Sequence, residues 1–238
     1  MKKYDYFFVI KRKNGVSDII PVEFDRSIRS KSIKITPQLA KKVIKVTYPI
    51  YVVKSRAVAF LEKQKNWIVN QLEKVPEKVE IKDGTKITFL ENEYKISNIP
   101  SARRGVWFEE GYIFVSGDLE FLNRRVKDFL KSEMKKYFTA KTHFYAKKIG
   151  KKFEKITVKD TVSRWGSCAS NGHISYSWRL GFAPLFVVDY IVAHEVAHLE
   201  ELNHSYKFWK IVNEIYEGDV NEAQKWLSRN GLLLYSID

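Results

Sequence analysis

Three of the five histidines in this chain lie within eleven residues, next to a glutamate. They form the pattern H-E-x-x-H-x-x-x-x-x-H, which comprises His194, Glu195, His198 and His204. Side chains four residues apart project from the same face of a helix, so His194 and His198 can bind one metal ion. Three protein ligands leave the fourth tetrahedral position of zinc open, as a catalytic site requires. The pattern therefore predicts a catalytic zinc site.

The glutamate within this pattern has the spacing of a general base. Glu195 directly follows His194, which brings its carboxylate near a water molecule on the metal. It can accept a proton from that water and transfer it to a leaving group, provided that it does not itself bind the metal. Asp189 could orient a ligand histidine from outside the metal's ligand shell, but five residues do not return to the same helix face.

The third histidine can reach the metal only if the helix ends before it. Six further helical residues would carry His204 to the opposite face, about a turn and a half from His198. We therefore expect a break after about Leu202, with Asn203 as the helix stop and Ser205 as the N-cap of the next helix. Carboxylates also serve as third zinc ligands, and the alternatives here are Glu200, Glu201 and Glu214.

A second cluster lies upstream, where residues 164–168 read Arg-Trp-Gly-Ser-Cys. A glycine in a strand often marks a bulge or a close backbone approach, and a strand edge beside a metal can pair with an extended substrate. Cationic side chains can stabilise an oxyanion or a carboxylate. The candidate substrate or oxyanion residues are Arg164, Trp165, Gly166 and Arg179. We expect Cys168 to be a small buried residue rather than a ligand or a nucleophile.

Hydrophobic periodicity predicts the elements that frame these residues. Alternating runs predict strands at residues 6–11, 19–24, 32–35, 43–46, 155–158, 162–168 and 173–178. They also predict a pair of strands within 85–97 and two strands at 105–108 and 112–115 on either side of a turn at Gly111. Helical stripes predict helices at 55–74, 119–149, 205–216 and 219–229, besides the metal helix after Pro184. Turns are expected at Asn14-Gly15 and Asn171-Gly172, a cap at Asp118 and a helix stop at Gly150. The order predicts an α+β protein with a β-rich region at 1–117 and a metal-binding domain at 118–238.

The composition is that of a globular protein and restricts its compartment. No run of eighteen apolar residues exists, so we expect neither a membrane-spanning segment nor a membrane partner. The apolar stretch at residues 6–10 is too short for the core of a signal peptide. Cys168 is the single cysteine, which excludes an intrachain disulfide. Together these features predict a cytoplasmic protein.

The net charge of +14 is spread unevenly along the chain. Residues 1–184 hold 38 Lys+Arg and 19 Asp+Glu, whereas residues 185–238 hold 4 and 9. The part with the metal pattern is thus acidic, and the basic surplus lies upstream. This surplus makes nucleic acid a candidate partner through region 1–152, against the alternative of a solvated lysine-rich surface.

Residues 160–212 resemble a known family. The matching residues run through Ser163-Arg164-Trp165-Gly166-Ser167-Cys168, Asn171-Gly172, Trp178-Arg179-Leu180, Ala183-Pro184, Asp189-Tyr190, His194 to Leu199, Asn203-His204-Ser205 and Phe208-Trp209. This series resembles the YgjP-like metallopeptidases, which are distantly similar to SprT-like and WLM zinc proteases. The resemblance implies a zincin-like domain whose active-site helix packs on a small antiparallel sheet. It also implies one zinc ion on His194, His198 and His204, with Glu195 as base. The resemblance does not supply a substrate, and a polypeptide of unknown identity is the expected partner. Val196 departs from the usual leucine, which leaves zinc binding intact.

Four functions compete at this point. The first is a zinc-dependent peptidase, and the second is a metal-dependent hydrolase of nucleotides or phosphoesters, which the basic surplus could attract. The third is a DNA-associated protease of the SprT-like type, and the fourth is a structural zinc module. The open fourth metal position counts against the structural module. Imidazole sites also accept other transition metals, so the residues alone do not fix the metal.

Overall fold

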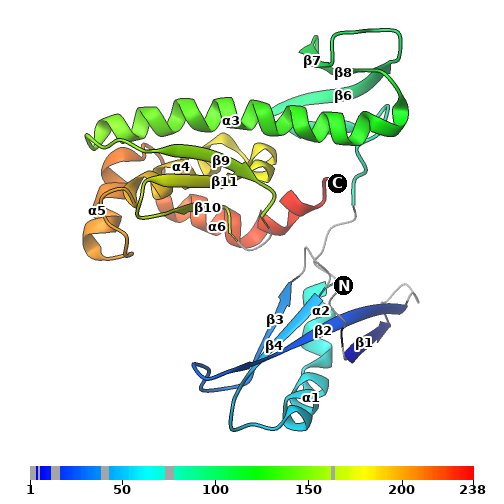
Figure 1. Ribbon diagram of the computed structural model, residues 1–238, viewed down its shortest axis with the longest axis vertical. Helices are drawn as coiled ribbons and strands as arrows, with labels where there is room; N and C mark the ends of the chain where they lie inside the picture. The colour runs from blue at the N-terminus through cyan, green and yellow to red at the C-terminus, as the bar shows by residue number, and fades with distance from the viewer. Residues whose placement is uncertain (1–3, 5, 12–16, 39–42, 73–77, 162–163) are drawn as a thin grey trace. The chain divides into compact units, whose positions relative to one another are not determined.

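The computed structural model describes residue 4 and residues 6–11, 17–38, 43–72, 78–161 and 164–238 of the chain. It divides into two compact units, Met1–Glu77 (the first unit) and Lys78–Asp238 (the second unit) (Figure 1). The boundary differs from the one expected after residue 117. The intervening strands belong with the second unit because they pack against its long helix, a contact between elements that periodicity does not reveal.

The first unit is a mixed four-stranded sheet accompanied by two helices. Its elements are β1 (Tyr6–Lys11), β2 (Ser17–Ser27), β3 (Lys34–Gln38), β4 (Val43–Pro49), α1 (Lys54–Lys63) and α2 (Lys65–Leu72). The strand order is β1-β2-β4-β3, and β2 and β4 run parallel. The sheet buries Phe8 and Val46 against Leu61 and Ile68 of the helices. Hydrophobic burial of this kind is what stabilises so small a unit.

The sequence expectations for the first unit hold in part. The strands are confirmed, but the single helix expected at 55–74 is two helices that meet at Gln64. The turn expected at Asn14-Gly15 lies outside the described residues.

The second unit is an α+β arrangement around the helix α3 (Figure 1). Its strands are β5 (Lys86–Phe89), β6 (Asn92–Ile99), β7 (Val106–Glu109), β8 (Tyr112–Ser116), β9 (Lys155–Lys159), β10 (Gly166–Cys168) and β11 (His173–Ser177). Its α-helices are α3 (Leu122–Lys148), α4 (Leu185–Ala197), α5 (Tyr206–Ile215) and α6 (Val220–Asn230). Three short 3-10 helices complete it: η2 (Leu119–Phe121), η3 (Trp178–Phe182) and η4 (Gly231–Tyr235). None of the described helices is long and apolar enough to cross a membrane.

Two sheets lie in this unit, and both are mixed. The order of one is β5-β6-β8-β7, with β6 and β8 parallel. The order of the other is β10-β11-β9, in which β10 and β11 form the predicted hairpin while β9 pairs with β11 in parallel. The small sheet is therefore not purely antiparallel as expected. A turn signal such as Asn171-Gly172 fixes only the strands that flank it, so the β9–β11 pairing was not visible locally.

The long helix is fixed to the small sheet by buried aromatic and hydroxyl contacts. Phe138 of α3 stacks on Tyr176 of β11 with 4.4 Å between ring centroids, and the hydroxyls of Thr142 and Tyr176 are 3.0 Å apart. Removing so large a buried ring as Phe138 costs about 3–5 kcal/mol in typical cores. Gly150, with a φ of +64°, ends α3 as expected. Asp118 makes no side-chain cap, because η2 separates it from α3.

Candidate metal centre

The helix α4 carries the first part of the site through the middle of the second unit. It is apolar nearly all round, and Val187, Val188, Val192 and Val196 are fully buried. Such a helix must be surrounded by protein, and it contacts α3, α5, α6 and β10. His194, in the last turn of α4, therefore lies in a site that is surrounded by these other elements.

The helix ends before the third histidine, as that histidine requires. The last helical residue is Ala197, and His198 is the C-cap. The backbone N–H of Leu199 donates to Val196 and that of Glu200 to Ala197, which tightens the turn. The break comes several residues earlier than the one expected after Leu202. The early end lets the following loop turn back toward the helix.

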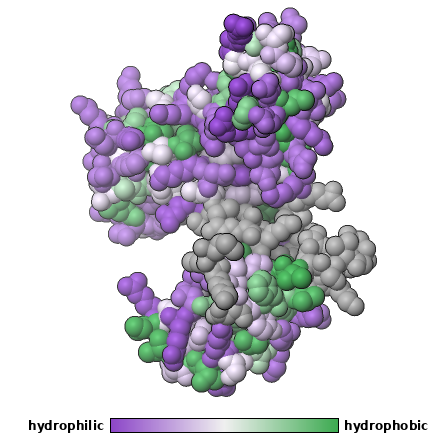
Figure 2. All heavy atoms as spheres, turned by 45° about the vertical axis from the view of Figure 1, so that its right-hand side comes forward, coloured by the Kyte–Doolittle hydropathy of each residue, from purple (hydrophilic) through white to green (hydrophobic). Residues whose placement is uncertain are grey.

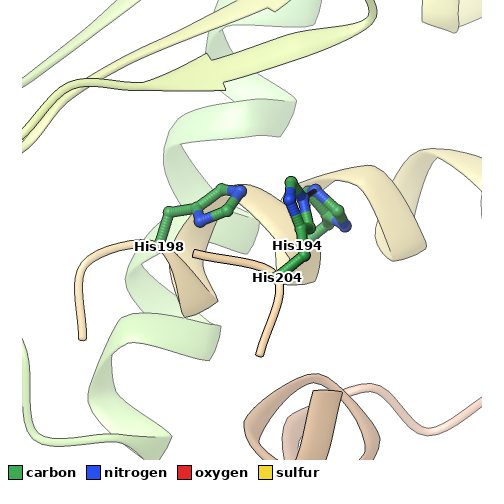
Figure 3. Close-up of side chains that lie close together, drawn as sticks. All are labelled: His194, His198 and His204. Atoms are coloured by element: carbon green, nitrogen blue, oxygen red, sulfur yellow. Dashed lines mark hydrogen bonds between the residues drawn. The ribbon is translucent and has the colours of Figure 1, made fainter. Parts of the chain in front are cut away.

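The three histidines meet at one point (Figure 3). One ring nitrogen from each of His194, His198 and His204 lies within 4.8 Å of the others, so the group could hold a metal ion. The Nε2 atoms of His194 and His204 are 3.0 Å apart. The three side chains come from the last turn of α4, its C-cap and the loop before α5.

The environment of the rings favours metal binding. The Nδ1 of His198 donates to the backbone carbonyl of Glu201 at 3.0 Å, which leaves Nε2 free to bind a metal. Burial lowers the pKa of His194 to about 4, with smaller contributions from His198 and His204. His194 is therefore neutral at pH 7, and its buried Nδ1 finds no hydrogen-bond partner among the described residues. Neutral imidazole is the form that binds zinc, so the ring of His194 is ready to bind, and the three converging imidazoles fit this metal.

The predicted cap after His204 is confirmed. The Oγ of Ser205 accepts a hydrogen bond from the backbone N–H of Phe208 at 3.4 Å, and α5 begins at Tyr206. This start places His204 against the first turn of α5. The ring of Phe208 is fully buried, and its centroid is 4.4 Å from that of the His198 ring and 4.7 Å from that of the His204 ring. The first turn of α5 therefore packs against both histidine rings.

The carboxylates that were alternatives for the third ligand have other contacts. Glu200 forms an ion pair with Lys151 at 2.6 Å, and Glu214 lies 3.8 Å from Lys210. Glu201 contributes its backbone carbonyl to the ring of His198. In the part of the chain that the structure describes, the candidate metal group consists of the three histidines alone.

Glu195 lies beside this group in a dry environment. It is 5% exposed, and desolvation raises its pKa to about 8, although the positive charge of Arg164 acts in the opposite direction. The backbone of β10 passes directly over it. A Cβ atom added to Gly166 would be 2.5 Å from Glu195 Oε1, a distance at which atoms clash. The expected close approach at this glycine is therefore between β10 and the candidate base.

The other upstream candidates divide between the site and the scaffold. Trp165 and Gly166 line a cavity with His194 and Glu195, whereas Arg164 is exposed. Arg179 does not line that cavity. Its buried guanidinium forms an ion pair with Asp160 at 2.7 Å and donates to the carbonyl of Ile237 at 2.7 Å, so it fixes the end of the unit. The oxyanion role expected for Arg179 has no geometric support, because its donors point to these partners.

Two more residues near the pattern have structural contacts. Asp189 accepts hydrogen bonds from the Tyr137 hydroxyl and the Lys141 ammonium, both at 2.6 Å, so it joins α4 to α3 instead of orienting a histidine. Cys168 is half-buried, and burial together with the charge of Glu195 raises its pKa to about 11. A thiol so strongly protonated is a poor nucleophile and a poor ligand.

Sequence reasoning missed the residues that α6 contributes to the site. Gln224 and Leu227 line the cavity beside His194 and Glu195, and Gln224 donates to the hydroxyl of Tyr190 at 2.9 Å. The amphipathic pattern of α6 indicates that one face is buried. It does not indicate that this face lies against α4, because that is decided by tertiary packing.

Comparison with known proteins identifies the family of this chain. The family model described as "YgjP-like, metallopeptidase domain" matches residues 31–230. No curated protein matches the chain. A solved structure with some similarity is the metallopeptidase zymogen abylysin of Pyrococcus abyssi, at 17% identity and a TM-score of 0.35, over 39% of this chain and 93% of that one. Because the family model spans most of the sequence, this chain belongs to the YgjP-like metallopeptidases and is a metal-dependent peptidase.

Proposed function

We propose that this peptidase uses one zinc ion per chain, held by His194, His198 and His204, with Glu195 as the general base. The observation that carries the proposal is the convergence of three imidazole nitrogens within 4.8 Å of one another. Three histidines are a donor set of catalytic zinc sites and leave one position for a reactant. The buried carboxylate next to them supplies the acid–base group that hydrolysis needs.

Glu195 moves the proton in this scheme. A bound zinc ion would supply the Lewis acidity that makes a water molecule reactive near neutral pH. Glu195 accepts the proton of the attacking water and later gives it to the amine that leaves. Burial raises the pKa of this carboxyl, and a divalent cation bound beside it would lower that pKa, so that the carboxylate can accept the proton. The backbone at Gly166 restricts where this carboxylate can lie.

The strand β10 favours a polypeptide as substrate. It lies at the edge of the order β10-β11-β9 and passes directly over Glu195. An edge strand offers backbone N–H and C=O groups to an extended peptide, which would add a strand beside the metal centre. Such pairing needs no particular peptide sequence, whereas a nucleotide substrate would need hydrogen-bond donors or cations that bind its phosphate groups.

Exchange of the base tests the proposal. Glu195→Gln should keep the metal content of the wild type but lower peptide hydrolysis by about 10²–10⁴-fold, because the amide cannot accept the proton. Glu200→Gln, at an exposed carboxylate paired with Lys151, is the matched control and should stay active. Unchanged hydrolysis in Glu195→Gln would contradict the mechanism. Release of phosphate from a nucleotide panel without peptide cleavage would favour the phosphoester alternative.

A second candidate function follows from the charge of the first unit. Residues 1–77 hold 17 Lys+Arg and 7 Asp+Glu, and the segments 26–38 and 47–61 contain no Asp or Glu. Tyr51 lies in the second segment, 74% exposed, and its hydroxyl donates to the backbone carbonyl of Lys31 at 3.0 Å. In Figure 2, apolar residues reach the surface of this unit among hydrophilic ones. An exposed ring among cations is the composition of single-strand binding surfaces.

We therefore infer that the first unit can carry the peptidase to nucleic acid. Fluorescence anisotropy with a labelled DNA single strand at low salt should show binding that weakens as salt rises. The double variant Arg29→Gln, Lys31→Gln should reduce the slope of log K against log salt concentration by about 1–2. Tyr51→Ala should weaken binding because a base can no longer stack on the ring. Absence of binding at low salt would contradict this second candidate and leave the peptidase proposal intact.

A further inference from the structure

A cavity of about 270 Å³ opens beside the candidate base, between α4, α6 and β10. Two of its lining residues, His194 and Glu195, belong to the metal centre. The others are Trp165, Gly166, Tyr190, Ile191, Gln224 and Leu227. The cavity thus lies next to the position where a substrate would react.

The walls of the cavity are mostly apolar. Ile191 and Tyr190 are almost completely buried, and Leu227 is half-buried. The hydroxyl of Tyr190 already accepts a hydrogen bond from the side-chain amide of Gln224 at 2.9 Å. Among the lining residues, the ionisable groups near neutral pH are those of the metal centre itself. A carboxylate that entered the cavity would lose its hydration without gaining a cationic partner there.

The shape of the cavity is fixed by packing behind its walls. The ring centroids of Trp165 and Tyr235 are 5.1 Å apart. A Cβ atom added to Gly231 would be 3.2 Å from the ring of Trp165. Asp219 caps the start of α6 by accepting a hydrogen bond from the backbone N–H of Asn221 at 2.7 Å. Leu227 therefore lies on a capped helix, and the ring of Trp165 is held by its neighbours. Both walls are fixed before a ligand binds, as in a preformed side-chain pocket.

We propose that this cavity receives the apolar side chain of the substrate residue adjoining the scissile bond, and that the peptidase selects residues such as leucine and phenylalanine there. The inference rests on the proposed function and adds the substrate class. In an extended peptide paired with β10, alternate side chains point to the same face. One of these faces turns toward α4 and the cavity. A lysine side chain would instead pair with Glu195 and occupy the base.

Hydrolysis of a peptide series that varies only this position gives the first test. The zinc-loaded protein should cleave leucine and phenylalanine peptides with a kcat/KM at least about tenfold above alanine or aspartate peptides. Leu227→Phe fills the cavity and should remove the preference for large side chains while alanine peptides are still cleaved. Leu227→Ala enlarges it and should shift the preference toward phenylalanine. Lys225→Ala, at an exposed position of the same helix, is the control and should keep the wild-type profile.

Binding to an inactive variant separates this inference from the proposed function. Calorimetric titration of zinc-loaded Glu195→Gln with the same peptides should show at least about tenfold tighter binding of leucine than of aspartate peptides. Leu227→Phe in that background should abolish the difference. Such selective binding without hydrolysis in the wild type would support the cavity and contradict the proposed function. Hydrolysis or binding that is indifferent to this side chain, or that prefers lysine, would overturn the inference.

Discussion

Gly166 and Glu195 lie in contact across the site, the first in the edge strand β10 and the second in the buried helix α4. A Cβ atom on residue 166 would meet Oε1 of Glu195 at 2.5 Å and Cγ at 2.6 Å. The backbone of one element thus determines where the carboxylate of the other can stand. This contact joins the substrate-facing edge to the candidate base.

The first prediction concerns this contact. Gly166→Ala should push Glu195 aside and lower kcat by about 10–100-fold, since a displacement of 1 Å at a reacting group can cost that much. Metal content should not change, because the histidines are not touched. Steady-state kinetics with metal analysis measures both. Ser167→Ala, at the next residue of β10, is the control, and equal activity of both variants would contradict the contact's importance.

Metal removal should lower the stability of the second unit. A ligand that binds only the folded state stabilises it by about 2.7 kcal/mol when its concentration is a hundred times its Kd. Chelation should therefore lower the Tm of the wild type, and added zinc should restore it. In His204→Ala the shift on chelation should be much smaller. Thermal unfolding with and without chelator measures this, and an equal shift in both proteins would argue against His204 as a ligand.

Asp189 should matter for stability and not for the metal. Asp189→Ala removes the acceptor of Tyr137 and of the partly exposed Lys141, and hydrogen bonding to a charged group contributes about 1.5–3 kcal/mol where the pair is buried. We expect the free energy of unfolding to fall by about 2 kcal/mol with unchanged zinc affinity. Asp128→Ala removes an exposed pair with Lys131 and should cost less than about 0.5 kcal/mol. A large loss of zinc affinity in Asp189→Ala would show that Asp189 orients a ligand after all.

Cys168 should react slowly with alkylating reagents and faster at high pH. Its pKa is raised to about 11, so less thiolate is present at any pH below that value. At pH 8 the thiolate fraction should be about a hundredfold below that of a thiol with a pKa near 9. Iodoacetamide labelling followed by mass spectrometry, with the unfolded chain as reference, measures the ratio. Equal rates in the folded and unfolded chains would contradict the raised pKa.

Much of the site's chemistry follows from local sequence. The spacing of His194 and His198 on one helix is a consequence of helical geometry, and Ser205 is identifiable as a cap from its type and place. Gly166 was recognisable as a point of close backbone approach because glycine is the one residue type without a Cβ atom. These features depend on residues within about ten positions of one another, where backbone geometry dominates.

Tertiary structure decided which segments meet. The pairing of β9 with β11, the commitment of Arg179 to Asp160, and the placing of Leu227 beside Glu195 join residues that are distant in sequence. Side-chain types give a charge or an apolar surface but not its partner, because the partner depends on how whole helices and sheets pack. The sequence by itself therefore determined the metal ligands to be tested and their geometry on α4. The walls around them were decided by packing alone.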